Sequence, residues 1–236
     1  MTRIALETLS MKGFVATIKR TRRRGSVGFR FSSGQLVILA PHGMPKSELA
    51  LLLESKRAWV LAKLLLMAQQ RPQMQRHYVT GELLAFLDEE LVLQLAKGAY
   101  SIGRKGVSEL HVSVPEAKPV WIRNALVRWY KLQARVHLEQ RVSYFAPLVG
   151  AWPKSIEIKT YRARWGSCNT LGQLQFNWKI LMAPSAVVDS VVVHELCHLL
   201  HMHHGPEFWA EVKRVLPHYQ DARLWLKDEG HSLGLD

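Results

Sequence analysis

The residues with the clearest chemical potential lie between Val191 and Trp209, where the sequence reads VVVHELCHLLHMHHGPEFW. His194 and His198 are four positions apart, so on a helix their imidazoles share one face and can bind one metal ion together. Glu195 completes the pattern HExxH, in which the glutamate can take a proton from water activated by the metal. The motif therefore predicts a catalytic metal site with Glu195 as general base.

His204 is the candidate for a third metal ligand, six residues after His198. On one unbroken helix it would lie about 9 Å further along the axis, at ~1.5 Å per residue, which is too far to share a metal. We expect the helix to end between them, with left-handed backbone angles tolerated at His203, Gly205 as a cap and Pro206 opening the next helix. Three histidines with one open position are typical of catalytic rather than structural zinc sites.

The alternative for this motif is an ordinary helix that matches HExxH by chance. The preceding segment Ala186–Val193 is strongly apolar and predicts a buried helix, in which histidines and a glutamate without a partner would be costly. The spacing of His204 is that of metzincin peptidases, although the glycine of their turn is His201 here. Cys197 is expected to pack behind the site as a small apolar group, since a fourth protein ligand would close it.

Other polar residues near the motif have both a structural and a functional interpretation. His218 and Tyr219 follow the second predicted helix, and either could stabilise an oxyanion. Glu207, Asp221 and Asp228 could orient a ligand histidine through a hydrogen bond. The sequence alone does not choose among these five residues.

The composition is that of an ordinary globular protein. The chain has 236 residues, 48% of them hydrophobic and 22% charged, and its two cysteines argue against a secreted disulfide scaffold. Charges at Arg3, Glu7 and Lys12 interrupt the N-terminus, which therefore lacks the apolar core of a signal peptide. The longest apolar region, Leu49–Met67, also contains charges and does not predict a membrane span. We expect a cytoplasmic protein without a membrane partner.

The net charge of +13 is concentrated in the N-terminal half. Lys12–Arg30 holds seven basic residues and no acidic residue, and such a patch could bind nucleic acid. A solvated strand face is the simpler interpretation, because Phe29 and Phe31 are too few aromatic residues to indicate single-strand binding. A metal-stabilised nucleic-acid-binding protein without turnover is thus the alternative to a hydrolase.

Residues 1–118 predict a basic accessory region rich in β-strands, with one long helix. The helix is expected over Glu48–Gln70, with Ser47 as N-cap and Trp59 in the core. No internal repeat is visible. Alternating apolar residues predict strands over residues 14–18, 26–31, 36–40, 83–87, 91–96, 99–102 and 109–114.

Residues 119–236 predict a catalytic domain that begins after the boundary at Pro115–Pro119. A long amphipathic helix is expected from Trp121 to about Ala146. A β-hairpin of Ser155–Cys168 and Gln173–Leu181 follows, and it leads into the helix of the motif. The fold class predicted for the whole chain is α+β, with a zincin-like catalytic domain built from the HExxH helix and an antiparallel hairpin sheet.

Several short segments resemble one family when they are taken in order. The chain is similar to the YgjP-like metal-dependent hydrolases, which are predicted zinc metallopeptidases related at a distance to the SprT and WLM groups. The resemblance is strongest over Trp121–Leu226. The segments that carry it are Arg164–Cys168 (RWGSC), Phe176–Trp178 (FNW), Ala183–Pro184, His194–His198 (HELCH), His204 and Phe208–Trp209.

The resemblance implies that His194, His198 and His204 bind Zn2+, that Glu195 is the general base, and that the substrate is a peptide or protein. The family commonly has asparagine, histidine and serine around the third ligand, so His203 remains a reserve candidate. The N-terminal half also departs from the family at residues 87–90. The RWGSC segment could present an edge strand to an extended peptide. Trp165 would then flank the substrate, with a packed structural role as its alternative.

Overall fold

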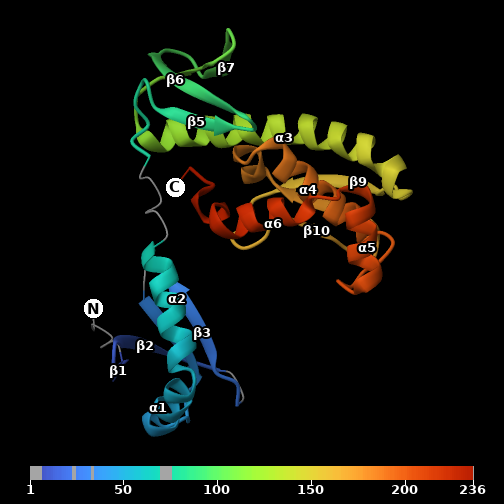
Figure 1. Ribbon diagram of the computed structural model, residues 1–236. Coiled ribbons are helices and arrows are strands. Elements are labelled where there is room, and N and C mark those ends of the chain that lie inside the picture. The colour runs from blue at the N-terminus through green and yellow to red at the C-terminus, as the bar shows by residue number, and fades with distance from the viewer. Residues whose placement is uncertain (1–6, 23–24, 33–34, 70–75, 236) are drawn as a thin grey trace. The chain divides into compact units, whose positions relative to one another are not determined.

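The computed structural model describes residues 7–22, 25–32, 35–69 and 76–235. Within them the chain forms six α-helices and three sheets, each of which contains parallel and antiparallel pairs (Figure 1). The α+β expectation is confirmed at this level. The contacts divide the chain into an N-terminal unit, Met1–Pro72, and a C-terminal unit, Gln73–Asp236. Each unit has a hydrophobic core of its own.

The N-terminal unit is a four-stranded sheet with helices against one face. Its strands are β1 (Glu7–Met11), β2 (Phe14–Thr21), β3 (Gly28–Ser32) and β4 (Gln35–Pro41). Their order is β1-β2-β4-β3, with β2 and β4 parallel and the outer pairs antiparallel. Alternate residues of the central strands are fully buried, such as Ala16 in β2 and Ile38 in β4, as expected for a sheet covered on one face.

The helical segment of this unit differs from the predicted single helix over Glu48–Gln70. It is divided into α1 (Lys46–Ser55) and α2 (Arg57–Gln69), with Lys56 at φ −109° and ψ 8° between them. The N-cap is Pro45 rather than Ser47, which lies inside α1. The expectation of a core Trp59 is also wrong, because half of this residue is exposed and its ring packs edge-on against Phe29 and Phe31 of β3.

The first sheet of the C-terminal unit repeats the topology of the N-terminal sheet. Its strands are β5 (Leu83–Phe86), β6 (Glu89–Lys97), β7 (Ser101–Lys105) and β8 (Glu109–Val114), close to the predicted positions. The order β5-β6-β8-β7 again has a parallel central pair between antiparallel outer pairs. Strand topology depends on apolar alternation and turns rather than on residue identity, which is why no repeat was visible in the sequence.

A long helix, α3 (Pro119–Val149), joins this sheet to the rest of the C-terminal unit (Figure 1). Towards the sheet, the Tyr130 hydroxyl donates a hydrogen bond of 2.6 Å to the Ala85 carbonyl. One continuous cluster of buried residues runs from Tyr78 to Leu235. The compact units therefore divide after Pro72, whereas the boundary expected at residue 118 falls inside the C-terminal unit.

The end of α3 lies slightly beyond the predicted one. The helix was expected to end near Ala146, but it continues to Val149 with Pro147 in its last turn. Gly150 caps the end in the left-handed conformation, at φ 77° and ψ 23°. A left-handed glycine is a common way to end a helix, because this conformation is strained for residues with a side chain beyond Cα.

The third sheet corrects the expected antiparallel hairpin. Its order is β10-β11-β9, formed by β9 (Ser155–Lys159), β10 (Gly166–Cys168) and β11 (Gln173–Asn177). β10 and β11 form the predicted antiparallel pair, but β9 pairs with β11 in parallel on the other side. The loop Thr160–Trp165 therefore crosses the end of β11 between the two outer strands. A short 3-10 helix, η1 (Trp178–Met182), takes the place of the predicted end of the return strand.

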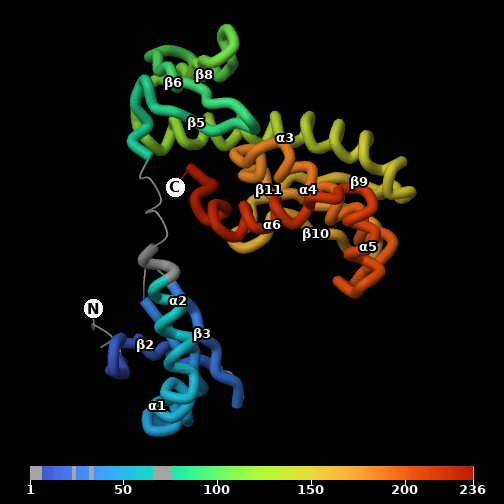
Figure 2. Tube along the Cα trace, in the orientation of Figure 1, coloured from blue at the N-terminus to red at the C-terminus, as the bar shows by residue number. Residues whose placement is uncertain are grey.

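Three helices follow this sheet and complete the C-terminal unit (Figure 2). They are α4 (Ser185–Cys197), α5 (Pro206–Val215) and α6 (Tyr219–Asp228), followed by the 3-10 turn η2 (Gly230–Ser232). Among the described residues, no helix combines the length and apolar composition needed to cross a membrane.

Candidate active site

The helix α4 holds the first half of the predicted metal site in its last turn. His194 and Glu195 lie in this turn, and His198 is the C-cap residue. The helix is fixed to α3 by a bidentate ion pair in which Arg141 donates to Asp189, at 2.6 and 2.8 Å. Since bidentate charge-assisted hydrogen bonds hold a defined geometry, this pair helps to set the position of the motif.

The chain turns sharply after His198 and returns towards α4 at His204. The turn is made by backbone hydrogen bonds from Leu200 and His201 to the Cys197 carbonyl. The left-handed residue expected at His203 is not found, because the non-glycine residues with positive φ in the described chain are Tyr78 and Leu87. Hydrogen bonds of this tight turn end the helix without backbone strain.

The start of α5 agrees with the sequence prediction. Gly205 is the N-cap in extended conformation, and Pro206 is in the first turn. Proline suits this position because its missing N–H would have no partner within the helix.

The turn brings three imidazoles together. One ligand nitrogen from each of His194, His198 and His204 lies within 4.8 Å of the others, and the Nε2 atoms of His194 and His204 are 3.0 Å apart. Nitrogens that bind one zinc at about 2.0–2.1 Å in tetrahedral geometry are roughly 3.3 Å apart, so the observed cluster fits such an ion. His203, the reserve candidate, is exposed and outside this cluster.

One hydrogen bond determines which nitrogen of His198 faces the cluster. The Nδ1 atom lies 3.1 Å from the carbonyl oxygen of His201, which can only accept a hydrogen bond. The proton is therefore on Nδ1, and Nε2 is left with a free lone pair for a metal. This contact comes from the backbone of the turn rather than from the carboxylates of Glu207, Asp221 or Asp228.

Aromatic rings from α5 support the histidines from behind. Phe208 is fully buried, and its ring centroid lies 4.6–4.9 Å from the centroids of all three imidazoles. Trp209 stacks on His204 at 5.6 Å and on Tyr219 at 5.5 Å. This packing limits the rotation of the rings and holds them in place before any ligand binds.

The environment of the histidines favours their neutral form. Burial, followed by the nearby His198 and His204, lowers the pKa of His194 to about 3. Burial also lowers the pKa of His198 below its ordinary value. Neutral imidazole is the form that binds a metal ion, so these two rings are ready for coordination near neutral pH.

Glu195 lies beside the cluster, where it is closely packed and shielded from solvent. The residue is 5% exposed, and burial raises the pKa of its carboxyl group to about 8, with the Arg164 guanidinium acting in the opposite direction. A β-carbon added at Gly166 of β10 would lie 2.6 Å from both Cγ and Oε1 of Glu195. This approach requires glycine in the RWGSC segment, because real Cβ contacts are never so short.

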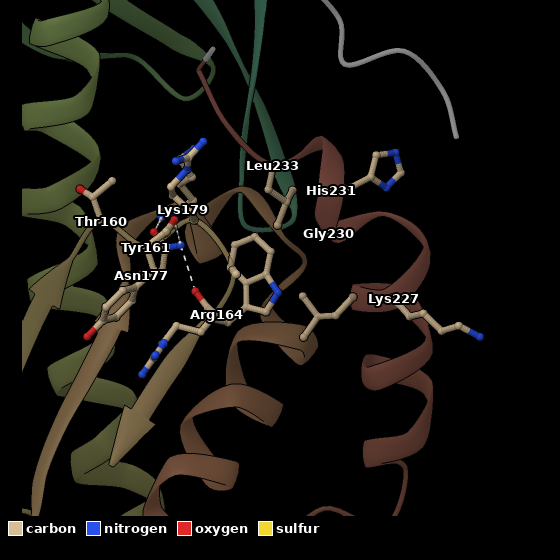
Figure 3. Close-up of a pocket in the computed structure, with 13 residues that line it drawn as sticks. Thr160, Tyr161, Arg164, Asn177, Lys179, Lys227, Gly230, His231 and Leu233 are labelled. Atoms are coloured by element: carbon tan, nitrogen blue, oxygen red, sulfur yellow. Dashed lines mark hydrogen bonds between the residues drawn. The ribbon is translucent and has the colours of Figure 1, made fainter. Parts of the chain in front are cut away.

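The loop that leads into β10 is held by a buried amide. Asn177 is 2% exposed, and its Nδ2 donates to the carbonyl oxygens of Tyr161 and Arg164 at 3.1 and 3.2 Å. Its backbone N–H donates to the Trp165 carbonyl at 2.7 Å. Trp165 is partly buried and lines a recess between this loop and η2, whose residues Gly230 and His231 lie across from Arg164 (Figure 3).

The remaining residues that the sequence singled out lie outside the imidazole cluster. Cys197 is fully buried and outside the imidazole cluster, as the apolar packing role predicted. Tyr219 belongs to the aromatic stack on Trp209, whereas His218 lines an apolar cavity between α4 and α6. The sequence interpretation missed the supporting roles of Phe208, the His201 carbonyl and Gly166, although Phe208 and Gly166 lie in segments that it had singled out.

Comparison with known proteins identifies the family. The profile described as "YgjP-like, metallopeptidase domain" matches residues 26–229. The solved structure titled "Crystal structure of the metallopeptidase zymogen of Pyrococcus abyssi abylysin" is similar over 38% of this chain and 93% of that chain, at 19% identity and a TM-score of 0.35. No curated protein matches the sequence. On the profile match, which covers most of its length, the chain belongs to the YgjP-like metallopeptidase family and is a metal-dependent peptidase.

Proposed function

We propose that this chain is a zinc-dependent metallopeptidase in which His194, His198 and His204 bind the metal and Glu195 moves the proton. The observation that carries this proposal is the convergence of three imidazole nitrogens within 4.8 Å, next to one buried carboxylate. Three protein ligands leave a coordination position for water or substrate, which distinguishes a catalytic zinc site from a structural one.

The donor set supports zinc over harder divalent ions. Neutral imidazoles suit zinc and similar transition metals, whereas magnesium and calcium prefer oxygen ligands. When bound, zinc would polarise the scissile carbonyl group, acidify water and favour the ionised form of Glu195 through its charge. The orientation of His198 by the His201 carbonyl presents Nε2 as the ligand atom.

Glu195 acts as the general base in this proposal. Its carboxylate takes a proton from the attacking water and then donates it to the nitrogen of the departing amine. Contact with Gly166 holds the carboxylate beside the histidines, and the apolar surroundings exclude competing water. These features keep the proton on Glu195 between the two transfer steps.

The free edge of β10 is the proposed binding surface for the substrate backbone. β10 is one of the two edge strands of its sheet among the described residues, and it approaches Glu195 at Gly166. An extended peptide can add to such an edge through backbone hydrogen bonds, which give affinity without strict sequence specificity. A peptide bound there would pass the Glu195 carboxylate, with Trp165 flanking it.

Nucleic-acid binding by the basic N-terminal region stays a prediction. Arg20 in this region is already engaged, since it donates two hydrogen bonds of 2.8 Å to Glu7. Arg23 and Arg24 lie outside the described residues. A non-catalytic metal site would barely respond to the loss of the Glu195 carboxylate, and this difference separates the two hypotheses.

The test combines metal content with hydrolysis. We expect about one zinc per chain in the wild type, and its loss in His194→Ala and His204→Ala, whereas the matched control His203→Ala should keep it. Glu195→Gln should retain zinc and lose hydrolysis of a mixed peptide pool by at least about 100-fold. Zinc that survives His204→Ala, or hydrolysis that survives Glu195→Gln, would refute the proposed roles.

A further inference from the structure

A recess of about 490 Å3 is lined by the β9–β10 loop, Asn177 at the end of β11, η1, the end of α6 and the C-terminal turn (Figure 3). Its lining contains several basic side chains and no aspartate or glutamate. The basic residues are Arg162, Arg164, Lys179 and Lys227, together with His231. Such a concentration of one charge in a concave surface attracts anions, because the field of the separate charges adds inside it.

Two of these cations are available to a ligand. Neither Arg162 nor Lys227 forms an ion pair with the acidic residues of the described chain, and both are exposed. Arg164 lies over the Tyr161 ring at 5.2 Å, a contact that leaves its N–H groups able to donate. Figure 3 shows Arg164 on the loop wall and Lys227 on the α6 wall of the recess, with the charged end of Lys227 directed away from Arg164.

The walls of the recess are fixed by packing. The loop wall is held by the buried Asn177 amide, through its bonds to the Tyr161 and Arg164 carbonyls. The opposite wall meets the loop at Gly230, where an added β-carbon would lie 3.2 Å from Cζ2 of Trp165. The recess is therefore part of the folded structure rather than a gap between mobile side chains.

The recess also lies next to the proposed reaction centre. Trp165 lines it, and the following residue, Gly166, contacts the Glu195 carboxyl group. An extended peptide advances roughly 3.3 Å per residue, so a peptide paired with β10 would reach the recess within about two residues of the bond opposite Glu195. Successive side chains point to opposite faces, which allows one of them to enter the recess.

We propose that this recess is a specificity subsite that binds a carboxylate of the peptide substrate, close to the scissile bond. The inference rests on the proposed peptidase function, and it names the substrate class as acidic peptides. The carboxylate belongs either to an aspartate or glutamate side chain or to the C-terminus of the peptide. Arg162 and Lys227 supply the charge, and Trp165 with Leu226 covers the apolar part of the side chain.

The test measures binding, so it does not depend on turnover. Zinc-loaded full-length Glu195→Gln is titrated into two fluorescent pools of amidated dodecapeptides, which have random neutral residues and either Glu or Gln fixed at the centre. We expect the Glu pool to bind about tenfold more tightly, a difference typical of a charge-assisted contact. A third pool, with central Gln and a free C-terminus, reports binding of the terminal carboxylate.

Two double variants in the same background locate the effect. Arg162→Gln/Lys227→Gln should abolish the preference for a carboxylate, whereas Arg128→Gln/Lys131→Gln should retain it. The control pair removes the same charge from exposed positions of α3 outside the recess. Preference for the free C-terminus alone would assign the subsite to the end of the substrate.

Two results would overturn the inference. They are equal binding of all three pools, and a carboxylate preference that survives Arg162→Gln/Lys227→Gln. Failure of the peptidase proposal would appear separately, as absence of Glu195-dependent hydrolysis by the wild type. Hydrolysis without preference for acidic peptides would leave the peptidase proposal standing and refute the subsite alone.

Discussion

The contact between Gly166 and Glu195 links the two most distinctive segments of the sequence. A general base must be held within a fraction of an ångström of its working position, because small displacements cause large losses in rate. In this chain the backbone of β10 approaches the carboxyl group more closely than any side chain would permit. The glycine of RWGSC is thus a positioning residue for the proposed base.

Gly166→Ala should impair hydrolysis while leaving zinc in place. The new methyl group would lie 2.6 Å from Cγ and Oε1 of Glu195, so the carboxylate or β10 must move. We expect hydrolysis of the mixed peptide pool to fall by about 100-fold, since a displacement of about 1 Å can have that effect. The free energy of unfolding should fall by about 1–3 kcal/mol from overpacking.

Gly103→Ala is the matched control for this prediction. Gly103 also lies in a strand, β7, but an added β-carbon there meets no atom within 4 Å. The change should alter the free energy of unfolding by no more than about 0.5 kcal/mol. If Gly166→Ala kept full hydrolysis, close contact with β10 would not be what positions Glu195.

The residues of the site differ in how far the sequence predicts them. His194, Glu195 and His198 follow from helical periodicity, and His204 follows from the distance argument that requires a turn. The roles of Phe208 and of the His201 carbonyl could not be predicted in this way. A packing ring and a backbone acceptor carry no distinctive spacing, and their roles appear only when α5 folds back against α4.

At the scale of elements, the interface between α3 and α4 contains a titratable histidine outside the active site. His137 of α3 is partly buried, and its Nε2 has no hydrogen-bond partner in the described structure. The groups that face it are Asp189 of α4, Asp88 and Arg141. Burial has the largest effect and lowers the pKa of His137 below its ordinary value.

This buried histidine should make stability depend on pH. Because its pKa is lower in the folded chain, the unfolded chain binds more protons as the pH falls through about 6.5, the ordinary value for histidine. Stability is then lost towards acidic pH, by at most about 1.4 kcal/mol per pH unit for a single proton. Denaturant unfolding of His137→Leu between pH 7 and 5 should show a shallower slope than the wild type.

Gln133→Leu provides the control, one turn earlier on α3. This substitution removes a polar group without removing a titratable one, so the slope of the wild type should remain. Equal slopes for the wild type and His137→Leu would mean that protonation of His137 does not oppose folding.

Elements with regular periodicity were predicted well, and those defined by tertiary contacts were not. The alternation of apolar residues predicted all four strands from β5 to β8. The parallel partner of β9 could not be predicted, because alternation shows which residues are buried and not which neighbour pairs with them. The break at Lys56 was missed for a similar reason, since leucines at helical spacing continue on both sides of it.

At the scale of the whole molecule, the two units differ in what they contribute to the site. All residues of the imidazole cluster, Glu195 and the recess lie in the C-terminal unit, Gln73–Asp236. The two ends of this unit meet in its core, where the Tyr78 hydroxyl donates a hydrogen bond to the Leu235 carbonyl. The core of the N-terminal unit consists of other residues.

The fragment 73–236 should therefore fold and bind zinc by itself. We expect one cooperative unfolding transition, and a zinc affinity within ~0.5 kcal/mol of that of the full chain, as for independent regions of a protein. The comparison requires denaturant unfolding and zinc titration of both proteins under the same conditions. A fragment without a cooperative transition would mean that the N-terminal unit is needed to complete the fold.

The fragment 119–236 distinguishes the observed division from the boundary expected at residue 118. It lacks the sheet β5–β8, whose buried residues Leu84, Leu91, Leu93 and Leu110 belong to the same core as α3. Each large apolar side chain buried in a core contributes about 1.5–3 kcal/mol, so the loss of several exceeds the stability of an ordinary domain. We expect this fragment to unfold without cooperativity, whereas stability equal to that of 73–236 would show that the sheet is a separate module. The sheet would then not be required for the catalytic elements to fold.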